Sequence, residues 1–276
     1  MTDTQQAPGK TGVAGCGRMG TPMLAALRAA GFDAHGLDVR PEAATDAVTL
    51  DPDTFADGLG TLITVVRDIP QTEEVLFAEQ ALVARAPGLR TIVLSSTLSP
   101  AYVRALRQRV PARIALVDAP MSGAQVRAER RELSFMLGGD VADLDRLQPL
   151  FDAMGATFHR MGPFGSGMAA KVLNNLLAAS NTAMTRLVLD WADAFGLDQD
   201  RLRGLVHASS GLNWFASHFD EIEFARDGFG SENTIGILVK DVESALDVAP
   251  DGADTALPRA VQKALRSLSP RGQDVA

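Results

Sequence analysis

The sequence has a single cysteine, Cys16, and only four histidines, His35, His159, His207 and His218. One cysteine excludes an internal disulfide framework and a cysteine-based zinc site. The histidines show no spacing that would bring them together on a metal ion. We therefore expect a protein of a reducing compartment that holds no metal.

Basic runs and long apolar runs are also lacking. The formal net charge is -8, and no series of Lys or Arg follows one face of a helix, which argues against binding to nucleic acid. Residues 1–11 are polar and lack the apolar segment of an export signal, and no apolar run reaches the roughly 18 residues of a membrane span. We expect a cytoplasmic protein with neither a nucleic-acid nor a membrane partner.

The first 160 residues alternate between β-type and helical patterns. With 276 residues, 46% of them hydrophobic, the chain is long enough for one large or two ordinary domains. The β-type runs are residues 11–15, 32–38, 61–66, 91–94, 113–117 and 133–137, and helical periodicity marks residues 21–30, 72–85 and 100–110. Strands alternating with helices predict an α/β fold, a doubly wound, mainly parallel sheet of the Rossmann type.

After Gly162-Pro163 the pattern is helical to the end of the chain. A long helix is predicted over residues 166–195, before Gly196, and at about 1.5 Å per residue it would span roughly 45 Å. Shorter helices are predicted over residues 199–208, 214–225, 235–248 and 258–268. We predict a dinucleotide-binding domain over residues 1–163 and an all-helical substrate and oligomerisation domain over residues 164–276. An apolar helical half of this size predicts a homodimer or homotetramer.

A glycine-rich turn follows the first β run. Residues Gly15, Cys16, Gly17, Arg18, Met19 and Gly20 form G-x-G-x-x-G directly before a helix. Glycines allow a tight turn and close approach to a pyrophosphate, and the helix N-terminus supplies N–H donors. The pattern predicts a dinucleotide site; the alternative is a glycine-rich turn that binds no nucleotide. Cys16 is interpreted as a small residue of the turn, not as a nucleophile.

The second β run ends at Asp38, about 20 residues after the glycines, where a carboxylate would accept hydrogen bonds from the adenosine ribose. A carboxylate repels a 2′-phosphate, which favours NAD over NADP. Arg40, two residues after Asp38 and next to Val39, weakens that preference because a guanidinium could receive the phosphate.

Lys171 and Asn175 lie four residues apart near the start of the long predicted helix. One helical turn separates them, so both side chains face the same way. An amine and a carboxamide on one face suit proton transfer to an oxygen, with the lysine as acid or base and the amide holding the oxygen. Asn174 is the alternative amide, but the spacing selects Asn175.

Three segments together resemble the β-hydroxyacid dehydrogenase family, which includes the 3-hydroxyisobutyrate, tartronate semialdehyde and L-threonate dehydrogenases. They are residues 13–23 with the glycine-rich turn, residues 118–124 (DAPMSGA) followed by residues 133–139, and residues 162–175. The Lys240-Asp241 pair and the tail Gly272-Gln273-Asp274 also match the family pattern.

This resemblance implies reversible hydride transfer between a nicotinamide cofactor and the carbinol carbon of a small 2- or 3-hydroxy acid. Lys171 would be the general acid/base, with its pKa lowered from about 10.4 toward neutrality, and Asn175 would hold the reacting oxygen or fix the lysine. Ser122 and the backbone amides of Gly123 and Ala124 would bind the substrate carboxylate.

Other matched positions would line the cofactor and the substrate. Thr97, with Val66 and Arg67 in place of the family's usual Leu-Pro, would lie along the nicotinamide half of the cofactor. Lys240 would reach cofactor and substrate in a cleft next to the helical domain. Trp214, after Asn213, would contact substrate or would belong to the core.

Departures from the family pattern leave alternatives open. Arg127, Arg130 and Arg131 stand where the family has small residues, and they either bind a second anionic or polyhydroxylated group or are solvated on a loop. Residues 65–77 and 209–215 are more similar to the L-threonate branch. The competing functions are an imine reductase of the same fold, which Lys171 argues against, and a non-catalytic NAD(P)-binding module.

Overall fold

The computed structural model describes residues 9–272. Contacts divide the chain into two compact units, Met1–Lys171 and Val172–Ala276, and the division falls inside one long helix, α8 (Ser166–Phe195). The predicted domain boundary between residues 163 and 164 lies just upstream and stays a prediction.

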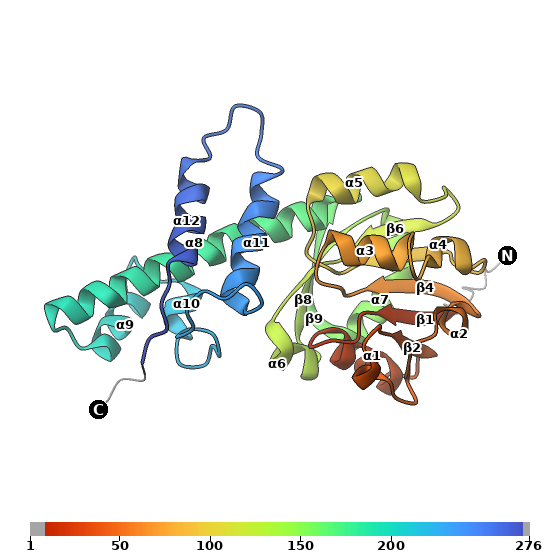
Figure 1. Ribbon diagram of the computed structural model, residues 1–276, viewed down its shortest axis with the longest axis horizontal. Helices are drawn as coiled ribbons and strands as arrows, with labels where there is room; N and C mark the ends of the chain where they lie inside the picture. Colours follow the sequence, from red (N-terminus) through yellow and green to blue (C-terminus); the bar gives the residue numbers. More distant parts are fainter. Residues whose placement is uncertain (1–8, 273–276) are drawn as a thin grey trace. The chain divides into compact units, whose positions relative to one another are not determined.

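The first unit contains a nine-stranded sheet in the order β3-β2-β1-β4-β5-β6-β8-β7, with β9 beside β8 (Figure 1). The strands are β1 (Lys10–Ala14), β2 (Ala34–Leu37), β3 (Val48–Thr49), β4 (Leu59–Thr64), β5 (Thr91–Leu94), β6 (Ala115–Asp118), β7 (Met121–Ser122), β8 (Leu133–Gly138) and β9 (Gly155–Gly162). The first six pair in parallel, whereas β8 runs antiparallel to β6 and β7. The predicted doubly wound α/β fold is confirmed.

Helices cover both faces of this sheet and bury it on each side (Figure 1). They are α1 (Gly20–Ala29), α2 (Pro52–Ala56), α3 (Ile69–Leu76), α4 (Leu82–Arg85), α5 (Pro100–Arg109), α6 (Ala124–Glu129) and α7 (Val141–Met154), with a 3-10 turn at Pro41–Ala43. Residues of α1 and α7 form one apolar core with the sheet, and residues of α2 to α5 form the other. Because both faces are covered, the central strands are continuous apolar runs and not alternating ones.

Several elements differ from the sequence prediction. Residues 72–85 form two short helices and not one: α3 ends at Leu76, and α4 begins after Ala81, which adopts a left-handed conformation (φ 45°). Strands β3 and β7 have two residues each, and β9 is mostly exposed, so none of them carries an apolar pattern that the sequence could reveal.

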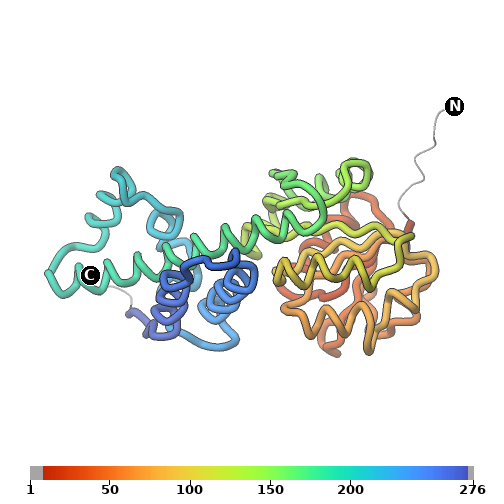
Figure 2. Tube along the Cα trace, turned by 90° about the horizontal axis from the view of Figure 1, so that it is seen from above, coloured from red at the N-terminus to blue at the C-terminus, as the bar shows by residue number. Residues whose placement is uncertain are grey.

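The second unit is helical, as predicted. It contains α8 from Val172 onward, α9 (Gln199–His207), α10 (Trp214–Ser217), α11 (Thr234–Leu246) and α12 (Ala256–Arg266). Helices α11 and α12 lie side by side and share an apolar core with α8 (Figure 2). The predicted bounds of the long helix, residues 166–195, are confirmed.

One helix of this unit is shorter than predicted. Residues 214–225 were expected to be helical, but α10 ends at Ser217 and turns follow. Phe215, Phe219 and Ile222 still pack into one apolar cluster. Turns can bury apolar residues at this spacing as well as a helix can. Periodicity alone therefore predicts too long a helix here.

Arg186 of α8 is fully buried and connects this helix to two later segments of the helical unit. Its guanidinium donates hydrogen bonds to the carbonyls of Ala225 (2.9 Å), Asp227 (2.7 Å) and Ser269 (2.6 Å). Burial lowers the pKa of this guanidinium from its usual value. Within residues 9–272, no helix is both long and apolar enough to cross a bilayer.

Candidate functional site

The glycine-rich turn links β1 to α1 and is packed as tightly as its sequence predicts. Gly15 has φ 95°, and a Cβ atom there would lie 2.6 Å from the Val65 carbonyl oxygen. A Cβ atom on Gly20 would lie 1.9 Å from the Gly15 carbonyl oxygen. Gly17 is different, because a Cβ atom there would have no neighbour closer than the Arg40 guanidinium at 3.9 Å. Two glycines therefore close the turn, and the third leaves room for a ligand to approach the backbone.

Helix α1 begins immediately after this turn. Its N-cap residue, Met19, makes no capping hydrogen bond with its side chain, so this side chain does not compete with a ligand for the first amides of the helix. Thr21 Oγ1 donates to the Cys16 carbonyl (2.8 Å) and steadies the turn. A helix N-terminus of this kind fits the pyrophosphate of a dinucleotide, and the residues present therefore suit the cofactor that the sequence predicts.

Asp38 directly follows β2 beside the glycine-rich turn, and its carboxylate accepts hydrogen bonds from two sides. The Cys16 amide donates to Oδ2 (2.8 Å), and the Arg40 amide (2.9 Å) and Nε (3.0 Å) donate to Oδ1. Burial opposes ionisation, but the hydrogen bonds from Arg40 and Cys16 outweigh it and lower the pKa of Asp38. Asp38 therefore carries a negative charge at neutral pH.

Arg40 covers Asp38 and also reaches the turn. Its Nη2 donates to Asp38 Oδ2 (3.1 Å) and to the Cys16 carbonyl (3.1 Å). The Arg40 side chain is 50% exposed, so it can leave this position at small cost. Neighbouring Val39 is exposed. Burial, and then the negative charge of Asp38, raise the pKa of the Cys16 thiol to about 12, which agrees with a packing role for Cys16.

The loops after β4 and β5 meet at the carboxyl edge of the sheet. The Val66 amide donates to Ser96 Oγ (2.9 Å), and the Arg67 amide donates to Gln71 Oε1 (3.0 Å). Thr97 is half-buried in the loop that follows Ser96. Since β4 and β5 are parallel neighbours, the structure brings Val66, Arg67 and Thr97 to the edge where open α/β sheets bind ligands.

The predicted carboxylate anchor lies between β7 and α6. Gly123 has φ 140° and Ala124 has φ 51°, so two successive residues have positive φ. A Cβ atom on Gly123 would lie 2.8 Å from Arg127 Cβ, which explains the glycine. Half-buried Ser122 pairs with Ser134 of β8 and so has a fixed backbone. An alanine with positive φ is a sparsely populated conformation of the kind that concentrates at ligand sites.

Asp118 is a residue whose importance the sequence did not reveal. It ends β6 and is fully buried. Its Oδ1 accepts a hydrogen bond from the Gly165 amide (2.7 Å), and its Oδ2 accepts one from the Met168 amide (2.5 Å). Burial raises the pKa of Asp118 to about 6, although the backbone amides act in the opposite direction. The only signal available was its place at the head of the DAPMSGA segment.

Lys171 and Asn175 lie one turn apart on α8, and both side chains are 8% exposed. Asn174, the alternative amide, is exposed. Asn175 Nδ2 donates to Asp241 Oδ2 of α11 (2.6 Å), and its Oδ1 accepts from Asn174 Nδ2 (3.3 Å). The amide of Asn175 is thus oriented by its neighbours.

Asp241 is the second residue that the sequence did not single out. Its side chain is buried, and Lys240 Nζ lies 3.8 Å from its Oδ1. The Lys240-Asp241 pair matched the family pattern, but only Lys240 was given a site role, because no sequence pattern shows that Asp241 meets a residue 66 positions away.

Trp214 and the three arginines near α6 lie on exposed surface, and Asn213 is half-buried. Trp214 is 57% exposed and stacks on His218 with ring centroids 5.4 Å apart, so the alternative of a core tryptophan is wrong. Asn213 caps α10 by accepting from the Ala216 amide (2.9 Å). The three arginines of the α6 region, Arg127, Arg130 and Arg131, are all exposed. Gln273 and Asp274 of the predicted tail motif lie outside the described residues.

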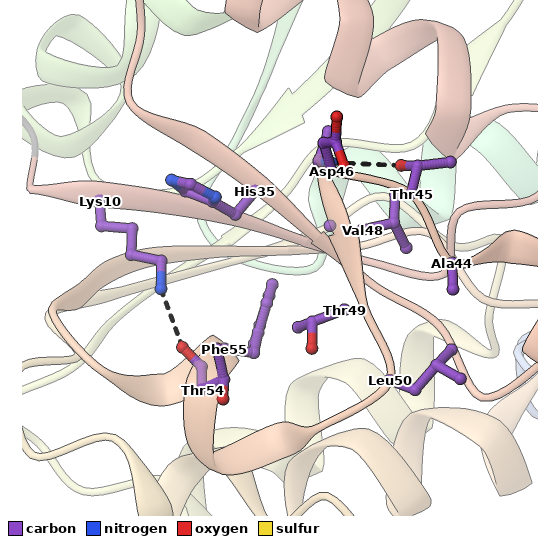
Figure 3. Close-up of a pocket in the computed structure, with 12 residues that line it drawn as sticks. Lys10, His35, Ala44, Thr45, Asp46, Val48, Thr49, Leu50, Thr54 and Phe55 are labelled. Atoms are coloured by element: carbon purple, nitrogen blue, oxygen red, sulfur yellow. Dashed lines mark hydrogen bonds between the residues drawn. The ribbon is translucent and has the colours of Figure 1, made fainter.

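The cavities on the first unit include one that adjoins the predicted site and one that does not. The latter, of about 330 Å³, lies by β2, β3 and α2, and there Lys10 Nζ donates to the Thr54 carbonyl (3.1 Å; Figure 3). Lys10 Nζ also donates to the Asp57 carbonyl (2.9 Å). None of its lining residues is a predicted site residue. The other, of about 610 Å³, is lined by Gly17, Arg18, one face of α1 and residues of α6, and it adjoins the predicted cofactor turn.

Comparison with known proteins agrees with this geometry. Residues 10–162 match the family described as the NAD binding domain of 6-phosphogluconate dehydrogenase, and residues 165–274 match the NAD-binding domain of NADP-dependent 3-hydroxyisobutyrate dehydrogenase. The chain is similar to 2-hydroxy-3-oxopropionate reductase of Escherichia coli (34% identity, covering 70% of this chain and 68% of the relative). It is also similar to L-threonate dehydrogenase of Cupriavidus necator (29% identity, covering 86% and 82%).

Among solved structures, 3-hydroxyisobutyrate dehydrogenase of Mycobacterium tuberculosis, described with L-serine, is similar over 94% of this chain and 96% of that one, with 26% identity and a TM-score of 0.79. The glycine-rich turn, the carboxylate at the end of β2 and these matches over both units agree with one another. The chain therefore belongs to the β-hydroxyacid dehydrogenase family and is an NAD(P)-dependent oxidoreductase of the hydroxyacid dehydrogenase type.

Proposed function

We propose that this enzyme interconverts a small 2- or 3-hydroxy acid and its oxo acid, with Lys171 as the general acid/base. The observation that carries the proposal is a buried lysine one helical turn from a buried, oriented carboxamide on α8. A lysine near the start of a helix is ordinarily a solvated charge. A buried lysine is uncommon, and such residues are concentrated at functional sites.

In the oxidative direction Lys171 Nζ takes the proton of the substrate hydroxyl as the carbinol C–H bond breaks and the C=O bond forms. When bound, the nicotinamide cofactor supplies the acceptor for the hydride. In the reductive direction the same amine returns the proton to the oxygen. Asn175 Nδ2 donates one of its two hydrogens to Asp241. Its second N–H, and a second lone pair on Oδ1, would bind the reacting groups.

Substrate binding is assigned to the turn between β7 and α6 and to two residues of the helical unit. We propose that Ser122 and the amides of Gly123 and Ala124 bind the substrate carboxylate, since this turn has two successive positive φ angles. Lys240 of α11 and exposed Trp214 of α10 are proposed as further substrate contacts. Lys240 is also proposed to contact the cofactor.

The proposed cofactor is NAD, with NADP as the alternative. The ionised carboxylate of Asp38 repels a 2′-phosphate and accepts hydrogen bonds from a bare ribose. The proposed contacts are Gly15, Cys16, Gly17, Arg18, Met19, Gly20, Asp38, Val39, Arg40, Val66, Arg67 and Thr97. Arg40 is the residue that would accommodate NADP, because its exposed guanidinium can turn from Asp38 toward a phosphate.

The substrate is proposed to be a three- or four-carbon acid. Relatives are named for L-threonate, 2-hydroxy-3-oxopropionate, L-serine and 3-hydroxyisobutyrate. These compounds share one carboxylate with a hydroxyl or oxo group on a nearby carbon, which suits one carboxylate anchor and one proton-transfer residue. L-Threonate is the first compound to test, because residues 65–77 and 209–215 are more similar to that branch.

A homodimer is proposed for the assembly. On α8, Leu177, Met184, Val188, Trp191 and Phe195 are exposed at intervals of seven, four, three and four residues, which places them on one helical stripe. Apolar stripes of this kind are normally buried by another helix. Light scattering tests this assignment. We expect a dimer that Trp191→Arg dissociates and that Leu257→Arg of α12 leaves intact, whereas a monomeric wild-type protein would refute the assignment.

A cytoplasmic location is proposed from the single, free cysteine.

The central test is NADH formation at 340 nm with a panel of three- and four-carbon hydroxy acids, repeated for Lys171→Ala. We expect kcat to fall by about 10²-fold or more, with NADH still bound, because general acid–base catalysis contributes on that order. Lys263→Ala, on the exposed face of α12, is the matched control and should keep full activity. Unchanged turnover in Lys171→Ala would remove the lysine from the mechanism.

A further inference from the structure

Asp118 joins two parts of the chain that bear different proposed functions. It lies at the end of β6, four residues before Ser122, and its carboxylate accepts hydrogen bonds from Gly165 (2.7 Å) and Met168 (2.5 Å). Met168 lies in the first turn of α8, and Lys171 follows three residues, or about 4.5 Å, farther along. One buried carboxylate therefore connects the segment of the carboxylate anchor to the helix of the proposed acid/base.

The first turn of α8 also packs against β8 in backbone contact. A Cβ atom on Gly167 would lie 2.3 Å from the Met136 carbonyl oxygen, and one on Gly138 would lie 2.3 Å from Asp118 Oδ1. Both glycines are needed for the helix, the strand and the carboxylate to approach this closely. The position of α8 along the sheet edge is thus strictly determined around Asp118.

Asp118 differs from the ordinary helix caps of this protein. Asp51, Asp68, Asp140 and Asp198 each immediately precede the helix that they cap. Asp118 lies 47 residues before Gly165 and belongs to a strand, so its hydrogen bonds fix α8 to the sheet. Burying a carboxylate costs free energy, and a polar link of this kind is retained where it specifies a position.

We propose that Asp118 is a positioning residue for Lys171: by binding the amides of Gly165 and Met168 it sets where Lys171 stands relative to the Ser122–Ala124 anchor. This inference rests on the proposed function of Lys171. A displacement of about 1 Å of a reacting group can reduce turnover on the order of 10²-fold. A residue that acts in this way should affect chemistry more than binding.

The test is Asp118→Asn, which keeps the size of the side chain but replaces one acceptor oxygen with an NH₂ group. This group cannot accept a hydrogen bond from the backbone amide that it faces. We expect kcat, counted per NADH-binding site, to fall about 10- to 100-fold, with the Kd for NADH and the KM for the hydroxy acid within about threefold. The primary isotope effect on kcat, measured with substrate deuterated at the carbinol carbon, should rise because the chemical step becomes slower. Asp198→Asn, the N-cap of α9, is the matched control and should change neither quantity.

Gly167→Ala provides a second way to displace the same turn while leaving the carboxylate in place, and it should reproduce the loss of kcat and the larger isotope effect. Wild-type kcat and isotope effect in Asp118→Asn would overturn the proposal, as would equal losses in kcat and in NADH binding. If Asp118→Asn does not fold, Gly167→Ala with normal kcat would overturn it instead. Full activity of Lys171→Ala would refute the proposed function, whereas a normal Asp118→Asn beside an inactive Lys171→Ala refutes only this inference.

Discussion

Two strands of the same sheet, β2 and β6, each have an aspartate at their carboxyl end, and the two carboxylates are in opposite electrostatic situations. At the end of β2, Asp38 accepts hydrogen bonds from a guanidinium and two amides, and its pKa is lowered. At the end of β6, Asp118 accepts hydrogen bonds from amides of the α8 start, and burial raises its pKa to about 6. An exposed cation nearby keeps a carboxylate charged, whereas backbone dipoles alone do not fully offset burial.

The difference also separates two uses of an aspartate at the carboxyl edge of a parallel sheet. Asp38 has an exposed partner, Arg40, that can move away and leave the carboxylate to a ligand. Asp118 has only rigid backbone donors among its described hydrogen bonds, and it is closed off from solvent. The first arrangement suits recognition of a cofactor, and the second suits a fixed position for a helix.

The largest effect is expected from Asp38→Ala. Loss of the carboxylate removes the acceptor for the ribose hydroxyls and releases the Arg40 guanidinium for a 2′-phosphate. We expect the ratio of kcat/KM for NAD to that for NADP to fall by about 10²- to 10³-fold, since rejection by a like charge costs several kcal/mol. Asp33→Ala, an exposed carboxylate before β2, is the control. An unchanged ratio would show that Asp38 does not face the ribose.

The second prediction concerns the stability that Asp118 contributes at different pH values. Its pKa rises from 3.8 to about 6 on folding, so the folded state holds the proton more tightly than the unfolded chain does. Its contribution to stability is therefore complete below about pH 4 and is lost as the pH rises through 6. The free energy of unfolding should fall by about 3 kcal/mol, because a shift of one pKa unit corresponds to about 1.4 kcal/mol.

Urea unfolding followed by circular dichroism at pH 3 to 7 measures this contribution. The free energy of unfolding of the wild type, relative to that of Asp118→Asn, should become less favourable by about 3 kcal/mol across this range. A constant difference between the two proteins would mean that Asp118 titrates as an ordinary exposed carboxyl, and the contrast between β2 and β6 would then disappear.

A smaller effect is expected from Arg40→Ala. Asp38 loses the hydrogen bonds and the positive charge that lower its pKa, while the Cys16 amide still binds it. A lowered folded pKa gives stability that is present above the unfolded value and is lost as the pH falls through the folded value, so the cost should be seen above about pH 4. Because the arginine is half exposed, we expect a loss of only about 1 kcal/mol of unfolding free energy at pH 7. Wild-type stability at pH 7 would mean that the ion pair contributes nothing measurable.

The sequence predicted one of these aspartates and not the other, for a physical reason. Asp38 belongs to a local motif: the glycine-rich turn and the acid about 20 residues later are both readable along the chain. Asp118 and Asp241 act through partners 47 and 66 residues away, and no local periodicity records such contacts. The long helix over residues 166–195 was predicted to the residue because thirty positions share one period, whereas exposed β9 has no apolar pattern.

The smallest effect is expected at Cys16, which lies beside Asp38 and shares its environment. Burial and the charge of Asp38 raise the pKa of its thiol to about 12, so almost none of it is thiolate at neutral pH. We expect iodoacetamide to modify Cys16 in the folded enzyme at pH 8 at least about 10²-fold more slowly than in urea, and Cys16→Ser to keep NADH affinity within about threefold. The backbone amide of residue 16, which binds Asp38, is unchanged by that substitution, and this is the reason for the small effect. Rapid alkylation of the folded protein would show that the turn opens, and the carboxylate at the end of β2 would then be less firmly held than the one at the end of β6.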